Sequence, residues 1–132
     1  MWGIDVSHHQ GKINWKEVKD SGIQYVIMKA MMETSRTADN RFEYNYEQSG
    51  NQGLLRGVYL YMKSTNPNEA RAEALDLLRI LNYRRLEKGI WLDIEDSKIR
   101  NVGTKVLTDM VIASSNALRS AGYDVGIYSN LD

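Results

Sequence analysis

The sequence predicts an α/β fold in which about five parallel strands alternate with helices, as in an incomplete (β/α) barrel. Short apolar segments alternate with segments of helical periodicity along the 132 residues. Strands separated by helices pair in parallel through right-handed crossovers. Because a closed barrel has eight strands, we expect the C-terminal strands to be missing and residues 1–132 to form a single, truncated domain.

Five segments have the composition of buried strands, since they are rich in branched apolar residues and tyrosine. They comprise residues 2–6, 23–30, 55–62, 89–95 and 123–128. In the first of them, Gly3 and Asp5 are expected on one face and Ile4 and Val6 on the other, because side chains alternate along a strand.

Four helices are expected between these strands, beginning near Asn14, Asp39, Pro67 and Thr104. Asn14 is a favourable N-cap with an acid three positions later, and proline is favoured at the first position of a helix. An apolar stripe predicts the face that the third helix buries. The stripe comprises Ala70, Ala74, Leu77, Leu78 and Leu81.

The composition excludes several classes of function. The 17 basic and 17 acidic residues cancel, so no net field favours nucleic acid or an anionic membrane as a partner. The chain has no cysteine, which excludes disulfide bonds and thiolate chemistry. The longest apolar run is far shorter than the ~20 residues that span a bilayer. The first residues also lack the pattern of a signal peptide.

The fourth expected strand carries the most informative pattern. Three apolar residues alternate there with Trp91, Asp93 and Glu95, so these three side chains share the opposite face. The rise of a strand places the Cα atoms of the two acids within roughly 7 Å of each other. Both acids lie at the C-terminal end of the strand, where parallel α/β folds build their active sites.

Two carboxylates this close repel each other, so the pKa of one rises and that group can stay protonated as a general acid. Glycoside hydrolysis needs one acid to protonate the leaving oxygen and one anion to support the cationic transition state. The pattern therefore favours a glycosidase site at Asp93 and Glu95. The alternative is a strand that ends in solvated acids capping the next loop.

Asp5 lies near the end of the first strand and is expected to face the same opening as Asp93 and Glu95. Its alternative role is to cap the turn that contains His8 and His9. Neighbouring histidines on an extended segment point apart and form a poor metal site, so we expect no metal and no cofactor. A substrate contact by one histidine and a plain loop position both stay open.

Tyr59 and Tyr61 share one face of the third strand and present flat apolar surfaces with polar tips, which suit sugar rings. Packing inside the barrel is the alternative for both tyrosines. Lys29, late in the second strand, is a further candidate on the inward face. Phosphate-binding glycine loops and the serine nucleophile elbow are both missing from the sequence.

Several blocks of residues occur in the order and spacing of a known family. They are Gly3–Gly11 (GIDVSHHQG), Ile13-Asn14-Trp15 with Val18, Tyr25–Ala30 (YVIMKA), Asp39 with Phe42 and Asn45, Gly53-Leu54 with Gly57 and Tyr59, Asp93-Ile94-Glu95, and Gly122-Tyr123 with Tyr128-Ser129. Together they resemble the lysozymes of glycoside hydrolase family 25, over essentially the whole chain.

The resemblance implies an N-acetylmuramidase that acts on the cell wall, outside the producing cell or after release by a phage. It would cleave the β-1,4 bond between N-acetylmuramic acid and N-acetylglucosamine in peptidoglycan, without a metal. By this resemblance Glu95 is the general acid/base, Asp93 assists the substrate's N-acetyl group or the developing positive charge, and Asp5 supports the site. Tyr128 joins the candidate substrate contacts.

Two segments depart from the family pattern. Met31–Ser35 replaces a Thr-Glu-Gly-like stretch, which puts the role of Glu33 in question, and Tyr59-Leu60-Tyr61 replaces Tyr-His-Phe. The expected missing strands would leave an open sheet edge, and we expect self-association through it.

Two other functions stay open. One is a non-catalytic remnant that binds cell-wall glycan. The other is a chitinase-like barrel hydrolase, although that family usually shows more spaced aspartates before its glutamate.

Overall fold

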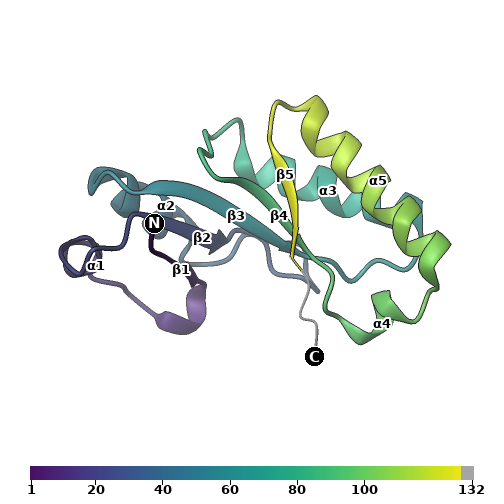
Figure 1. Cartoon of the computed structure of the whole chain (residues 1–132), viewed down its shortest axis with the longest axis horizontal. Helices are drawn as coiled ribbons and strands as arrows, with labels where there is room; N and C mark the ends of the chain where they lie inside the picture. The colour runs from purple at the N-terminus through teal and green to yellow at the C-terminus, as the bar shows by residue number, and fades with distance from the viewer. Residues whose placement is uncertain (129–132) are drawn as a thin grey trace.

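One parallel sheet forms the centre of the computed structural model, which describes residues 1–128 (Figure 1). Its strands follow the chain in the order β1-β2-β3-β4-β5, and all neighbours pair in parallel. The strands are β1 (Gly3–Val6), β2 (Tyr25–Lys29), β3 (Leu55–Tyr61), β4 (Gly89–Asp93) and β5 (Val125–Tyr128). The predicted α/β fold with five parallel strands is confirmed; Ser129 of the last sequence block lies outside the described residues.

Helices connect each strand to the next. They are the short 3-10 helix η1 (His8–Gln10), α1 (Trp15–Asp20), α2 (Phe42–Asn51), α3 (Pro67–Leu81), α4 (Ser97–Arg100) and α5 (Thr104–Ser120). The long helices α3 and α5 pack side by side, and α2 packs on β2 and β3 (Figure 1). No helix within residues 1–128 is both long enough and apolar enough to cross a membrane.

The helix signals in the sequence hold at α1 and α3. The Oδ1 atoms of Asn14 and Asn66 accept hydrogen bonds from the backbone N–H groups three residues later, at 3.2 and 2.9 Å. Pro67 occupies the first turn of α3. Four residues of the predicted stripe are fully buried, and Leu78 is partly buried against the same core.

Two predicted boundaries are wrong. The second helix begins at Phe42 and not at Asp39, because the Asp39 carboxylate accepts a hydrogen bond from Arg41 N–H and holds the preceding turn. Strand β4 ends at Asp93, so Glu95 follows the strand and does not belong to it. The short helix α4 comes directly after and was not predicted; Asp96 caps it through Lys98 N–H at 2.9 Å.

The two faces of the sheet differ in composition. The even-numbered apolar residues of the central strands are fully buried between the sheet and the helices. These are Val26, Met28, Val58, Leu60, Ile90 and Leu92. On the other face glycines alternate with large side chains, and a Cβ atom at Gly126 would lie 2.5 Å from the Trp91 ring. Glycine therefore lets the ring lie across the neighbouring strand.

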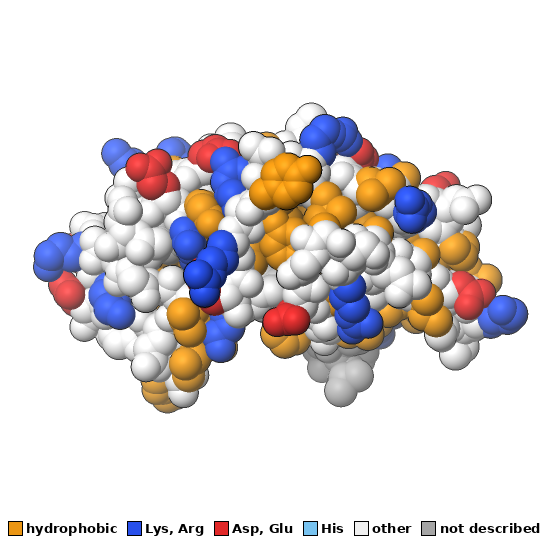
Figure 2. Space-filling model, turned by 90° about the horizontal axis from the view of Figure 1, so that it is seen from above, with side chains coloured by type: hydrophobic (Ala, Val, Ile, Leu, Met, Phe, Trp, Pro, Cys, Tyr) orange, Lys and Arg blue, Asp and Glu red, His pale blue; other side chains and the backbone are white. Residues whose placement is uncertain are grey.

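Both edges of the sheet are open within the described residues, since β1 pairs only with β2 and β5 only with β4. The exposed fractions of Ile127 and Tyr128 in β5 are 53% and 52%. Figure 2 shows hydrophobic side chains in several separate groups on the face seen from above. Unpaired strand edges with apolar side chains favour pairing with another chain.

We propose that a protein of these 132 residues self-associates through β5. Sedimentation velocity is expected to show a weight-average coefficient that rises with concentration in the micromolar range. Ile127→Lys should weaken the association, because lysine on an edge strand opposes pairing. Ile112→Lys on α5, at an equally exposed apolar position, is the matched control and should leave it unchanged. A single concentration-independent monomer would contradict the proposal.

Candidate active site

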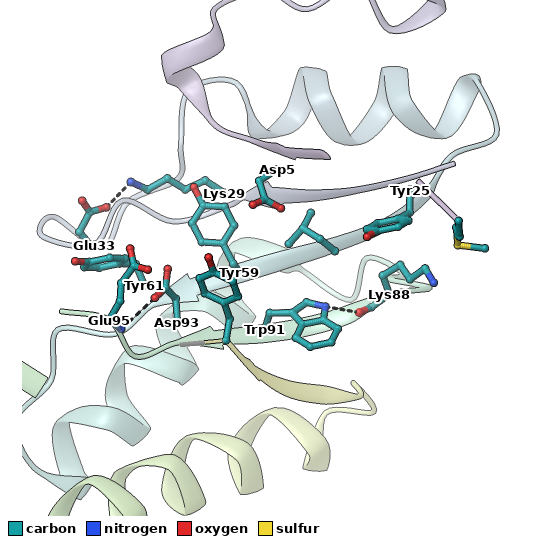
Figure 3. A pocket seen from close by; sticks show the side chains of 13 residues that line it. Asp5, Tyr25, Lys29, Glu33, Tyr59, Tyr61, Lys88, Trp91, Asp93 and Glu95 are labelled. Atoms are coloured by element: carbon teal, nitrogen blue, oxygen red, sulfur yellow. Dashed lines mark hydrogen bonds and ion pairs between the residues drawn. The ribbon is translucent and has the colours of Figure 1, made fainter. Parts of the chain in front are cut away.

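A hollow of about 880 Å³ opens on the face of the sheet opposite the helices (Figure 3). All seven residues that the sequence singled out line it: Asp5, Lys29, Tyr59, Tyr61, Asp93, Glu95 and Tyr128. They come from all five strands and from the turn after β4. The structure therefore brings the whole predicted set to one cavity.

The parallel register explains why these side chains meet. Lys29, Tyr59 and Trp91 are direct partners on neighbouring strands and form one row across the sheet. Tyr61 and Asp93 pair in the next row, toward the C-terminal ends, and Tyr128 is the partner of Asp93 on β5. Because side chains two residues apart share a face, both rows point into the hollow.

Asp93 and Glu95 occupy different environments within this hollow. Asp93 is the last residue of β4 and its exposed fraction is 8%, whereas Glu95 is exposed in the turn beyond the strand. The two residues contact through the Glu95 N–H, which donates to Asp93 Oδ1 at 3.2 Å. The expected shared strand face is therefore wrong in detail, but both carboxylates line the same cavity (Figure 3).

Burial raises the pKa of the Asp93 carboxyl to about 6. The negative charges of Glu95 and Asp5 act in the same direction, and the hydrogen bond from the Glu95 backbone opposes them. One raised pKa was expected in this pair, on the group that would act as the general acid. The structure raises it at Asp93, whereas the family resemblance gave the acid role to Glu95. The main cause of the rise is loss of water contact, and repulsion between the carboxylates is the smaller contribution.

Asp5 is exposed on β1 and faces the hollow. The turn after β1 is capped by Ser7, whose Oγ accepts a hydrogen bond from His9 N–H at 3.1 Å. Ser7 N–H in turn donates to Gln10 Oε1 at 2.6 Å. This capping box fills the alternative role considered for Asp5 and leaves its carboxylate available to the cavity.

The two tyrosines of β3 lie in different surroundings. Burial raises the pKa of Tyr59, and the nearby charges of Asp39, Asp5, Glu33 and Asp93 raise it further, so its hydroxyl stays protonated. Tyr61 donates its hydroxyl to Asp96 Oδ2 at 3.3 Å at the rim.

Lys29 is 8% exposed and its Nζ lies 2.5 Å from Glu33 Oε2. Burial acts to raise the pKa of Glu33, but its hydrogen bond and charge interaction with Lys29 hold the pKa below the ordinary value. Glu33 thus reaches the cavity from the loop that departs from the family pattern.

Sequence reasoning missed Tyr25 and Lys88, which line the hollow toward the N-terminal ends of the strands. The alternation that placed Lys29 inward also places Tyr25 inward, so this signal was present. Lys88 precedes β4 and carried no such signal. Within residues 1–128 no three His, Asp or Glu side chains converge as ligands for a metal ion.

A parallel α/β sheet with acids at the C-terminal end of a strand is the arrangement on which (β/α)-barrel enzymes build their sites. Residues 4–132 match the family described as Glycosyl hydrolases family 25, and the chain belongs to this family.

Known relatives agree with this assignment. The chain is 42% identical over 72 residues to Lysozyme M1 of Streptomyces globisporus, covering 54% of this chain and 24% of that protein. It is 26% identical over 129 residues to the autolytic lysozyme of Clostridium acetobutylicum, covering 98% of this chain and 38% of the relative. The chain therefore spans well under half the length of these relatives.

Solved structures share the fold. The modular autolysin LytC from Streptococcus pneumoniae superimposes with a TM-score of 0.82 at 25% identity, over 96% of this chain and 32% of that one. The bacterial lysozyme from Streptomyces coelicolor gives a TM-score of 0.79 at 27% identity, over 96% of this chain and 61% of the other.

The environment of Asp93 predicts a pH-dependent stability. The pKa of Asp93 in the folded state, about 6, exceeds the ordinary value of 3.8. The protonated carboxyl therefore contributes stability that is fully present below pH 3.8 and is lost as pH rises through 6. Asp93→Asn stays neutral and can still accept the Glu95 hydrogen bond. We expect it to be more stable than wild type at pH above 6, by on the order of 1–3 kcal/mol.

Urea unfolding of both proteins at acidic and at mildly alkaline pH measures this difference. The gain should disappear on the acid side. Equal free energies of unfolding for the two proteins across the whole pH range would show that the ionised Asp93 carboxylate does not destabilise the folded state.

Proposed function

We propose that this chain acts as a muramidase, hydrolysing the β-1,4 bond between N-acetylmuramic acid and N-acetylglucosamine in peptidoglycan. One observation carries the proposal: the buried Asp93 and the exposed Glu95 line one open hollow at the end of β4, with Asp5 beside them. Membership of glycosyl hydrolase family 25 and similarity to lysozymes support it.

Glu95 is the general acid and base of this proposal. Its exposed position at the rim lets the carboxyl reach the oxygen of a glycosidic bond in a chain lying along the hollow. Protonation of that oxygen lets the bond to the anomeric carbon break, and the leaving sugar departs with a hydroxyl group. The Glu95 carboxylate can then take a proton from the water whose oxygen bonds to the anomeric carbon.

Asp93 and Asp5 support the positive charge that develops on the sugar ring. Asp93 is held in place by the Glu95 backbone and lies deeper in the hollow, where a carboxylate can also accept the N–H of the substrate's acetamido group. In a site partly shielded from water this interaction is stronger than at the surface.

The substrate contacts of the proposal are Tyr59, Tyr61, Lys29 and Tyr128. The tyrosines offer aromatic faces to sugar rings. Lys29 adds a cation beside the acids of the hollow. The substrate implies that the enzyme works on bacterial cell walls.

Glu95→Gln tests the acid role. The amide keeps the shape of the side chain but cannot donate the proton, so clearing of purified cell walls should slow by on the order of 10²–10⁴. The exposed Glu47 on α2 lies outside the hollow, and Glu47→Gln is the control that should clear walls at the wild-type rate.

Two outcomes of the wall-clearing assay would count against the proposal. Equal clearing by wild type and Glu95→Gln would remove Glu95 from the acid role. If the wild type clears no walls but still sediments with them, the chain is a glycan-binding remnant and the catalytic proposal fails.

The raised pKa of Asp93 predicts the acid limb of the activity. If ionised Asp93 supports the transition state, kcat/KM should fall as pH drops through about 6, where the carboxyl takes up its proton. Asp93→Asn should be slower at neutral pH and should lack this limb. Release of reducing ends from soluble glycan strands measures both. An unchanged limb in Asp93→Asn would assign it to another group.

A further inference from the structure

His8 and Asp39 form a tight pair that the proposed mechanism does not use. The Asp39 side chain is fully buried, and its Oδ2 lies 2.7 Å from His8 Nδ1. The same oxygen accepts His8 N–H at 3.1 Å, and Oδ1 accepts Arg41 N–H at 2.8 Å. Because a buried carboxylate needs donors, the short contact requires a proton on His8 Nδ1.

This pair tethers the turn that follows β1. Residues 7–11 are otherwise bonded within themselves, through Ser7, Gln10 and the backbone. Among the described residues, the hydrogen bonds that join this turn to another element both run from His8 to Asp39. The turn is therefore fixed against the loop between β2 and α2 at one point, whereas β1 itself is held by its pairing with β2.

The tether lies beside the proposed site. His8 follows Asp5 by three residues, and the turn begins where β1 leaves the sheet after Val6. The charges of Asp39 and Asp5 both raise the pKa of Tyr59, so both carboxylates lie near its hydroxyl. Asp5 pairs with Ile27, and only Val6 separates it from the turn. Because β1 is paired on one side only within the described residues, release of the turn would loosen the end of the strand that carries Asp5.

We propose that His8 is a positioning residue, which acts through Asp39 to hold Asp5 in its place on the wall of the active site. The inference rests on the proposed function. Its physical basis is that catalysis falls steeply when a charged group is displaced from the reacting atoms.

Three variants at position 8 test the role. His8→Ala removes the donor, so kcat on soluble glycan strands should fall roughly 10- to 100-fold with little change in KM. The side-chain N–H of asparagine lies the same number of bonds from Cβ as the Nδ1–H of histidine. His8→Asn should therefore recover most of the wild-type kcat. The side-chain N–H of glutamine lies one bond further from Cβ, in the position of the histidine Nε2, so His8→Gln should not recover kcat.

His9→Ala is the matched control, because His9 is exposed on the same turn and makes no hydrogen bond to Asp39. The variant removes the ring that packs 4.1 Å from the His8 ring but keeps both hydrogen bonds from His8 to Asp39, so it should keep the wild-type kcat. Wild-type kcat in a folded His8→Ala overturns the inference. An equal loss of kcat in His8→Ala and His8→Asn, with matching falls in melting temperature, also overturns it, because that result indicates a purely structural role.

Nitrogen-15 NMR of the wild type provides a test that needs neither folded variants nor activity. When the His8 ring carries a single proton, that proton should be on Nδ1, and a single proton on Nε2 would overturn the inference. An inactive wild type with the Nδ1 proton in place would instead refute the proposed function. An active wild type with an unaffected His8→Ala would refute only the positioning role.

Discussion

The parallel pairing of all five strands is the constraint on which the rest of this structure depends. Parallel strands need a crossover after each one, and a strand order that follows the chain places the crossing helices on one face. The other face is left for side chains that do not serve the core. Residues far apart in the chain, such as Asp5 and Asp93, therefore reach one hollow without any loop having to carry them there.

Burial then separates two chemically similar acids. Asp93 ends a strand whose neighbours exclude water, whereas Glu95 lies two residues further on in solvent. In glycosidases the buried carboxyl with the raised pKa commonly stays protonated as the acid. Here that group is Asp93, so the acid role proposed for Glu95 rests on the family resemblance and on its exposed position, not on a raised pKa. The site thus follows from where β4 stops, since Asp93 is its last residue and Glu95 lies beyond it.

Sequence patterns predicted what depends on local periodicity and on strand ends. The five strands, the cap at Asn14, the proline that opens α3 and the inward face of β3 all follow from alternation and helix-start signals. The rest depends on tertiary contacts that no local pattern encodes. The buried Glu73 accepts hydrogen bonds from Lys63 N–H and Ser64 Oγ, which lie ten and nine positions before it in the chain. The pair of His8 and Asp39 joins residues 31 positions apart.

The carboxyl titration of Asp93, followed by carbon-13 NMR, tests the central claim most directly. The account predicts a midpoint of about 6 in the wild type, because the folded structure withdraws this group from water beside other acids. In Glu95→Gln the midpoint should be lower, since one neighbouring charge is gone, yet still above the ordinary 3.8 because burial persists. A wild-type midpoint near 3.8 would mean that Asp93 is solvated, and the two acids would then have no difference in environment to divide their roles.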